Sequence, residues 1–547
     1  MKIIFTNSIS LLPFIILIKI IIQISSEKIE ARITLSNTGE WTIYTSDFKE
    51  EYLYVATAYY ENTLQSKGFD LLAISTNSKF SDEIQAEAAG YLEGVLTKDI
   101  IYNHYLNLKD YFDYNVEEQV KSFFETQESY LYNEYSKNKS DPVIYGAYLM
   151  RKQYQGIKDG YNSVAEIDKK LTNFQFDIMS SNTDIDDLIE KFNFVKKDYK
   201  KMNYSQFEQN FIERTHCSAL FKIKNDFSDV YFGHNTWSPY NQLARIFKEY
   251  NFNFNSPFFS SKTIIFSSYP ATLSSFDDFY ITSNGLIIIE TTNVFYDNNL
   301  YDEITPNGLL SWERAMTSCR LSKNAKEWAE YFSMYSTGTY NNQYMILDKN
   351  KINLKNKTIS NDAFYIVEQL PGFMKINNVT DVFKFGYWSS YNTPFDKDII
   401  AKSKIQETIQ DDPTRAKLID YDICYRAKQF RRDQSNVNSI DDMKKILREN
   451  NYKTDEFSEL NPGYSISSRN DLNGKGCSGA YDAKVAALSE LFENEIKIHI
   501  IGGPSSEGDV DVFQFSTSEA CKNTPHYGVA DKPTFDWFEY TNQFNLK

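Results

Sequence analysis

Residues 213–237 combine two short segments of alternating apolar and polar positions around a polar turn, which predicts a β-hairpin. From Cys217 onward the alternation has a period of two, as in a partly buried strand. Asn, Asp and Ser residues surround Phe227 and supply turn chemistry. In a hairpin centred there, Cys217 faces roughly Trp237. A slip of one residue would decide whether His234 or Trp237 shares the face of Cys217.

The chain before this hairpin changes from strand patterns to helix patterns. Residues 31–60 alternate as strands do, whereas residues 81–112 and 116–135 place apolar side chains three to five residues apart, as amphipathic helices do. Residues 179–214 are polar, charged and weakly patterned. We expect this last segment to be an exposed linker, either a processing region or an ordinary surface loop.

The chain after the hairpin contains further strands and a long helix. Residues 277–293 form the clearest hairpin pattern, with Asn284-Gly285 where a type I′ turn is expected. Residues 309–333 predict a long helix. Further strand patterns lie at 263–269, 338–348 and 496–504. Strands and helices occur in runs rather than in strict βαβ alternation, and no internal repeat is present. The sequence therefore predicts an α+β layered fold.

Composition narrows the possible partners. The 547 residues include 58 Lys and Arg against 74 Asp and Glu, a net charge of 58 − 74 = −16. An acidic chain of this kind is a poor nucleic-acid binder, and no basic face for a membrane stands out. The length allows more than one domain, although single folds of this size exist.

The N-terminus predicts secretion. Residues 1–26 carry a positive charge at Lys2, then an apolar run, and end in small residues, as a signal peptide does. An uncleaved membrane anchor is the alternative. Four Asn-x-Ser/Thr sequons agree with a glycosylated protein, namely Asn138, Asn203, Asn356 and Asn378. Apart from this N-terminal run, no second apolar segment predicts a stable membrane span.

Five cysteines are few for a secreted chain, and their odd number leaves at least one thiol free. Cys477 and Cys521 both lie in C-terminal segments with loop patterns, and we expect a disulfide between them. Cys319 falls in a helical pattern and is expected to be buried. Cys217 is then either a small buried hydrophobe or a reactive thiol.

Several blocks recur in the order found in one protein family. They are "CSALFKI" (217–223), "HNTW" (234–237), "GLIIIETTN" (285–293), "LLSWERA" (309–315), "GTYNNQYMILD" (338–348), "EQLPG" (368–372), "YWSSYNTPF" (387–395), "RAKQFRRDQSNV" (426–437) and "YDAKVA" (481–486). In these blocks the chain resembles the phospholipase B-like family of lysosomal and secreted hydrolases. One departure is the segment around Cys477, where the family usually carries several cysteines and this chain has one.

The resemblance implies an αββα sandwich of the N-terminal nucleophile hydrolase type, preceded by a mostly helical segment. It also implies autoproteolysis between His216 and Cys217. A fragment of residues 27–216 would then remain associated with a catalytic fragment of residues 217–547. The free α-amine of Cys217, with a pKa of about 7.7–8, would take the thiol proton and serve as the base.

Five further site residues follow from the resemblance. His234 and Trp237 match the family's H-x-x-W, where the histidine polarises substrate or positions Cys217 and the tryptophan walls the pocket. Related choloylglycine-type hydrolases place Asn, Asn and Arg in comparable order, which implies Asn293 in an oxyanion hole, Asn392 near the amine and Arg432 orienting the nucleophile. The alternatives are turn-capping asparagines, a salt-bridged arginine, and a core histidine and tryptophan.

The resemblance implies an acyl hydrolase of phospholipids or N-acylated lipids. An amidase acting on N-acyl small molecules with the same site, or an inactive lysosomal glycoprotein that binds a ligand, are the alternatives. The sequence contains neither G-x-S-x-G nor H-E-x-x-H, and His104, His499 and His526 lack the sequence spacing of metal ligands. We therefore predict no cofactor and no metal, and a secreted or lysosomal, N-glycosylated protein.

Overall fold

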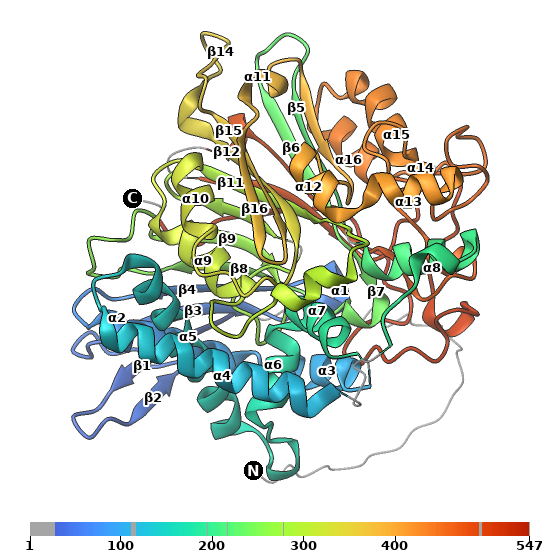
Figure 1. The fold of residues 1–547 in the computed structure, drawn as a ribbon. Coiled ribbons are helices and arrows are strands. Elements are labelled where there is room, and N and C mark those ends of the chain that lie inside the picture. The colour runs from blue at the N-terminus through green and yellow to red at the C-terminus, as the bar shows by residue number, and fades with distance from the viewer. Residues whose placement is uncertain are drawn as a thin grey trace, which may run out of the picture.

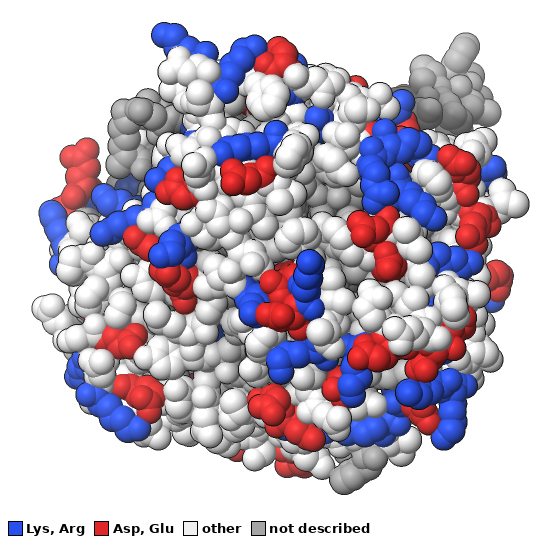
Figure 2. Space-filling view, turned by 45° about the horizontal axis from the view of Figure 1, so that its top comes forward, with Lys and Arg blue, Asp and Glu red and all other residues white. Residues whose placement is uncertain are grey.

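The computed structural model describes residues 28–110, 116–193, 195–215, 217–276, 278–491 and 495–545. The predicted signal peptide, residues 1–26, and the residue before Cys217 lie outside the described residues. No helix in the described ranges is long and apolar enough to cross a membrane. Over the face shown in Figure 2, positive and negative side chains are interspersed.

Two large sheets form the centre of the molecule (Figure 1). In spatial order, the strands of the eleven-stranded sheet are β16 (Phe373–Asn378), β15 (Phe364–Leu370), β12 (Asn342–Asp348), β11 (Leu286–Thr292), β10 (Phe279–Thr282), β9 (Thr263–Ser268), β8 (Ile246–Asn251), β4 (Asp70–Thr76), β3 (Ala56–Glu61), β1 (Lys28–Leu35) and β2 (Trp41–Tyr44). Those of the six-stranded sheet are β17 (Tyr387–Ser390), β5 (Ser218–Ile223), β6 (Val230–Asn235), β19 (Asp482–Ala487), β20 (Lys497–Gly502) and β21 (Phe538–Thr541). Two-stranded ladders join β7 (Trp237–Pro239) to β18 (Ser478–Ala480) and β13 (Ile352–Asn353) to β14 (Thr358–Ile359).

The helices fall into an N-terminal group and a group after the central strands. The first group is α1 (Leu64–Lys67), α2 (Asp82–Leu96), α3 (Lys98–Leu108), α4 (Glu117–Lys137), α5 (Pro142–Val164), α6 (Asn173–Ser180), α7 (Asn182–Phe192) and α8 (Tyr204–Arg214). The second is α9 (Ser311–Leu321), α10 (Ala325–Phe332), α11 (Thr380–Phe383), α12 (Lys397–Ser403), α13 (Ile405–Asp411), α14 (Ala416–Ile419), α15 (Tyr425–Asp433) and α16 (Ile440–Arg448). The protein is thus a mixed α+β fold with a helical N-terminal segment.

Three apolar cores show how these elements pack. The first lies between the eleven-stranded sheet and helices that include α2, α5 and α9. The second lies between the two sheets and takes Phe221 and Phe232 from the smaller one. The third lies between the six-stranded sheet and helices α15 and α16, and takes Leu220 from β5. Successive side chains of β5 therefore enter different cores, as the predicted period of two requires.

The hairpin of β5 and β6 forms with a register one residue away from the predicted one. Ser218 pairs with Asn235 and Ala219 pairs with His234. Because Cys217 is two residues from Ala219, it shares the face of His234. Trp237 lies beyond the end of β6 and begins β7, so the open question of the register is settled in favour of His234.

Several predicted elements have different bounds in the structure. The predicted helix at 81–112 is divided into α2 and α3 at Thr97, and the one at 309–333 is divided into α9 and α10. The side chain of Asn324 caps the second of these, accepting a hydrogen bond of 2.9 Å from the backbone N–H of Glu327. The predicted type I′ turn is also wrong, because Gly285 has a positive φ of 93° but Asn284 does not.

The predicted linker at residues 179–214 is wrong, because this segment folds as α7 and α8. Both helices have buried faces: Ile185 and Leu188 on the first, and Phe207 and Phe211 on the second. Phe207 and Phe211 are four residues apart and therefore lie on the same side of α8. The many charged residues of the segment cover the outer faces and conceal this sparse apolar pattern in the sequence.

The cysteines are arranged as expected. Cys477 and Cys521 form a disulfide, and Cys217, Cys319 and Cys424 are buried and not disulfide-bonded. Cys319 lies within α9, as its helical pattern predicts.

Candidate active site

Cys217 lies at the start of the six-stranded sheet, immediately before β5. Its side chain is buried, and its backbone has a φ of 81°, which is uncommon for a residue with a Cβ atom. The carbonyl oxygen of Cys217 accepts a hydrogen bond of 2.7 Å from Nη1 of Arg426. The end of α8 approaches from the N-terminal side, since this helix stops at Arg214. The cysteine is therefore held in a strained, well-defined backbone position.

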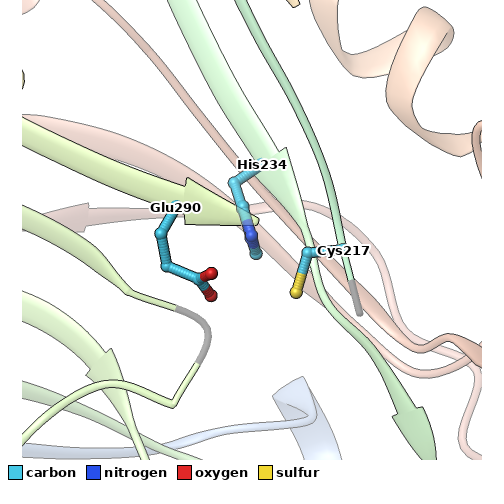
Figure 3. Close-up of side chains that lie close together, drawn as sticks. All are labelled: Cys217, His234 and Glu290. Atoms are coloured by element: carbon cyan, nitrogen blue, oxygen red, sulfur yellow. The ribbon is translucent and has the colours of Figure 1, made fainter. Parts of the chain in front are cut away.

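Three side chains converge between the two sheets next to this position. Cys217 and His234 come from the six-stranded sheet, and Glu290 comes from β11 of the eleven-stranded sheet (Figure 3). One ligand atom of each residue (the sulfur, an imidazole nitrogen and a carboxylate oxygen) lies within 4.8 Å of the other two. A thiol, an imidazole and a carboxylate in this arrangement can exchange protons, and the same atoms can bind a metal ion.

Glu290 was not predicted from the sequence as a site residue. Its Oε1 accepts a hydrogen bond of 2.8 Å from the hydroxyl of Tyr340, which also donates to the carbonyl of Phe276. The signal in the sequence is a carboxylate that follows three isoleucines in a buried strand. A buried charged residue of this kind needs partners and is a candidate functional group.

Arg426 holds the cysteine from the helical side. Its Nη1 also contacts Oγ of Ser218 at 3.1 Å, and its Nη2 donates to Oδ1 of Asn392 at 2.7 Å. The guanidinium group lies 4.2 Å from the centre of the Trp237 ring. Among the described residues, Arg426 forms no ion pair with a carboxylate, so its positive charge remains available to stabilise a thiolate at Cys217.

Arg432, predicted to orient the nucleophile, does not contact the cysteine. It pairs with Asp433 at 2.7 Å and Asp455 at 2.6 Å, and its side chain is 39% exposed. Six residues of α-helix rotate a side chain by roughly 240°, so α15 cannot direct both Arg426 and Arg432 towards Cys217. The contact expected of Arg432 is made by Arg426.

The two predicted asparagines both lie at the end of β11. Asn392 has a φ of 69° and bridges two elements, because its Nδ2 donates to the carbonyl of Thr292 at 2.8 Å while its Oδ1 accepts from Arg426. Asn293 is buried, and neither polar atom of its side chain has a hydrogen-bond partner in the described part of the chain. An unpaired buried amide costs free energy, so Asn293 has donor capacity available for a ligand.

Trp237 is fixed next to this cluster. Its ring N–H donates to Oδ1 of Asn235 at 3.1 Å and to the carbonyl of Ile466 at 3.2 Å. Asn235 also accepts from the backbone N–H of Ser218 at 3.1 Å. The tryptophan is therefore tied through one amide to the strand that follows Cys217, and it lines a cavity of about 470 Å³.

A second cavity of about 340 Å³, which we call the acidic cavity, also borders the site. Among its lining residues are Asp186, Asp187, Glu190, Glu213, Asn293 and Tyr340. Burial raises the pKa of Asp186 to about 7, with further repulsion from Asp187 and Glu190. Burial also raises the pKa of Asp187 to about 7, although Arg214 opposes this shift. Glu213, near the end of α8, lines both cavities.

Comparison with known proteins gives a consistent classification. The sequence pattern of the family described as Phospholipase B matches residues 56–540. Phospholipase B-like 1 of Rattus norvegicus is 35% identical over 494 residues, 88% of this chain and 86% of the relative. Phospholipase B of Crotalus adamanteus is 35% identical over 88% of this chain and 87% of the relative. Phospholipase B-like protein B of Dictyostelium discoideum is 32% identical over 93% of this chain and 88% of the relative. The chain therefore belongs to the phospholipase B family, a family of hydrolases.

Proposed function

We propose that the protein is an acyl hydrolase of lipids that uses Cys217 as an N-terminal nucleophile. The observation that carries this proposal is the position of the thiol: it precedes β5, is buried between two sheets, and lies with His234 and Glu290 within 4.8 Å. The three apolar cores, with helices outside each sheet, fit the αββα sandwich of N-terminal nucleophile hydrolases.

Activation begins with cleavage of the peptide bond between His216 and Cys217. The thiol of Cys217 attacks the carbonyl carbon of His216, and the backbone nitrogen of Cys217 leaves as an amine, giving a thioester. Water then hydrolyses the thioester, which releases a carboxylate on His216 and restores the thiol. The positive φ of Cys217 favours this step, because strain in the scissile segment is relieved on cleavage.

The same thiol then acts on the substrate. The free α-amine of Cys217, with a reference pKa of about 7.7–8, accepts the thiol proton, and the thiolate attacks the ester carbonyl. The developing oxyanion needs donors, which the unpaired amide of Asn293 can supply. Proton transfer to the leaving oxygen gives an acyl thioester, and water hydrolyses it to a free fatty acid.

The two fragments would remain together after cleavage. Strand β4 precedes the cleavage site and β8 follows it, yet they pair in parallel from Asp70–Ile246 to Ser75–Asn251. The cut therefore leaves a continuous eleven-stranded sheet that contains strands from both fragments. Separating them would expose this ladder and the apolar core beneath it.

Secretion to a lysosome-like compartment accompanies this proposal. All four sequon asparagines, Asn138, Asn203, Asn356 and Asn378, are exposed, as attachment of a glycan requires. A disulfide between Cys477 and Cys521 suits an oxidising compartment.

Trapping of the acyl-enzyme tests the proposed reaction. We expect the fragment that starts at Cys217, quenched with acid during turnover of phosphatidylcholine, to gain one acyl group that neutral hydroxylamine removes. In Cys217→Ser any trapped acyl group would be an oxygen ester and would resist hydroxylamine, whereas Cys424→Ser would behave as the parent protein. Intact mass spectrometry reads both results. Acylation only from N-acyl amides would indicate the amidase, and no acylation would favour the inactive binding glycoprotein.

A further inference from the structure

Cys217, His234 and Glu290 offer a combination of sulfur, nitrogen and oxygen that suits a divalent metal ion. These ligand atoms come from two strands, β6 and β11, and from the residue that precedes β5; they lie within 4.8 Å of one another, facing a common space (Figure 3). Zn²⁺ binds such ligands at about 2.0–2.3 Å, with tetrahedral neighbours roughly 3.3–3.8 Å apart. Closing the cluster around an ion requires movements of about 1 Å. We propose that this cluster binds Zn²⁺, or an ion of the same ligand preferences, and that the bound ion blocks the thiol.

The charges of the cluster match those of the ion. All three side chains are buried, with at most 1% of their surface exposed. When Zn²⁺ binds, the Cys217 thiol releases one proton to solvent and forms a sulfur–zinc bond, while Glu290 binds as carboxylate and His234 as neutral imidazole. Two negative charges and one divalent cation sum to zero. A neutral set is the one that a buried site accommodates at least cost.

Surrounding groups hold the ligands in place. The hydroxyl of Tyr340 donates to Oε1 of Glu290 at 2.8 Å and fixes the carboxylate, as partners outside the ligand shell do in metal sites. The backbone of Cys217 is fixed by Arg426 at 2.7 Å. Because His234 and Glu290 project from paired strands rather than loops, the geometry of the site is supported by both sheets.

The acidic cavity provides a route for a cation. Tyr340 lines this cavity and also contacts Glu290, so the cavity ends one side chain from the cluster. Its walls carry four carboxyl groups (Asp186, Asp187, Glu190 and Glu213) and two basic side chains (Lys197 and Arg214). Because the pKa values of Asp186 and Asp187 are raised to about 7, the cavity has a negative excess near neutral pH and loses it in acid. A cavity with an excess of one charge raises the local concentration of the opposite ion.

The consequence for activity rests on the proposed function. A thiolate bound to zinc has its electron pair committed to the metal and cannot attack an ester carbonyl. Lipid hydrolysis that bound metal inhibits should therefore recover when a chelator removes the ion. The sequence gives no spacing signal for this site, because positions 217, 234 and 290 meet only when the two sheets pack.

Co²⁺ is the probe that tests metal binding independently of activity. Addition of Co²⁺ to the purified protein should produce a near-ultraviolet thiolate-to-cobalt band and intense visible bands typical of four-coordination. Cys217→Ala should abolish the near-ultraviolet band, and Cys424→Ala, which removes a buried thiol elsewhere, should keep it. Loss of a residue that only hydrogen-bonds to a metal ligand weakens metal binding by about 10- to 100-fold. Glu290→Gln removes a ligand itself and should weaken Co²⁺ binding by more than that. Tyr340→Phe, which retains every ligand, should weaken it within that range.

The outcomes separate this inference from the proposed hydrolysis. A hydrolase that cleaves lipid but gives no thiolate–cobalt band overturns the metal site and leaves the reaction intact. An uncut, inactive protein that still gives the band overturns the reaction and leaves the metal site intact. Equal affinity in the parent protein, Glu290→Gln and Tyr340→Phe overturns the metal site, because chelation by the amine and thiol of Cys217 alone would then explain the band.

Discussion

Cys217→Ala protein is expected to remain a single uncut chain and to release no fatty acid above background. The substitution removes the sulfur that we propose attacks both the His216 carbonyl and the substrate, while alanine fits the same small buried site. Removing a covalent nucleophile has cost on the order of 10⁶ in kcat in a well-studied hydrolase, so complete loss is expected. Denaturing gel electrophoresis measures the cleavage, and release of fatty acid from phosphatidylcholine measures the reaction.

Cys319→Ala provides the matched control, since it removes another buried thiol. Cys319 accepts a hydrogen bond of 3.4 Å from the ring N–H of Trp328, and burial raises its pKa to about 12, so it stays protonated. Its alanine variant should be cut and should hydrolyse lipid as the parent protein does. Activity that persists in Cys217→Ala, or is lost equally in both variants, would contradict the assignment of the nucleophile.

Arg426→Met is expected to slow cleavage and to lower kcat by about 10²-fold or more, the range for removal of one preorganised donor. The guanidinium donates to the carbonyl of Cys217 and to Oδ1 of Asn392, so methionine removes one donor from each of two buried acceptors. Losing a hydrogen bond to a buried acceptor costs about 1–3 kcal/mol of folding free energy. A kcat that falls further than KM rises, in protein that is still folded at the assay temperature, would indicate lost positioning.

Arg432→Met tests whether Arg426, as the structure indicates, or Arg432, as the sequence resemblance implies, orients Cys217. Arg432 is partly exposed and pairs with Asp433 and Asp455, and such surface pairs contribute at most about 1 kcal/mol. We expect cleavage and kcat close to those of the parent protein. Loss of activity in Arg432→Met together with normal activity in Arg426→Met would reverse the assignment.

Arg426→Lys should recover part of the activity that Arg426→Met loses, because lysine supplies the positive charge but not the bidentate geometry of a guanidinium group.

Local patterns in the sequence predicted several strands, including β5, β6, β9, β10, β11 and β12, and the expected disulfide between Cys477 and Cys521 is confirmed. Strands β4, β8, β15 and β19 were not predicted. The alternation after Cys217 correctly predicts that Phe221 and Leu220 point to opposite faces of β5. Register was harder to predict, because the turn around Phe227 allows pairings that differ by one residue. The observed pairing of Ala219 with His234 fixes which side chain joins the cysteine.

Long-range packing explains what the sequence did not reveal. Glu290 becomes part of the site only because β11 of one sheet packs over β5 of the other, and nothing near Glu290 in the sequence indicates this contact. Arg426 and Arg432 occur in one block of basic residues, and only the rotation of α15 distinguishes the buried arginine from the exposed one. The helix α8 was missed because its apolar face consists of a few aromatic residues among many polar ones.

The N-terminal sequence and intact mass of the two fragments test the central claim most directly. The mature, deglycosylated protein should contain a fragment that begins Cys217-Ser218-Ala219-Leu220 and extends to Lys547, and a second fragment from the N-terminal part that co-purifies with it. This result would establish the free amine that the proposed chemistry requires. An active protein that consists of one uncut chain, or whose C-terminal fragment begins at another residue, would contradict the account.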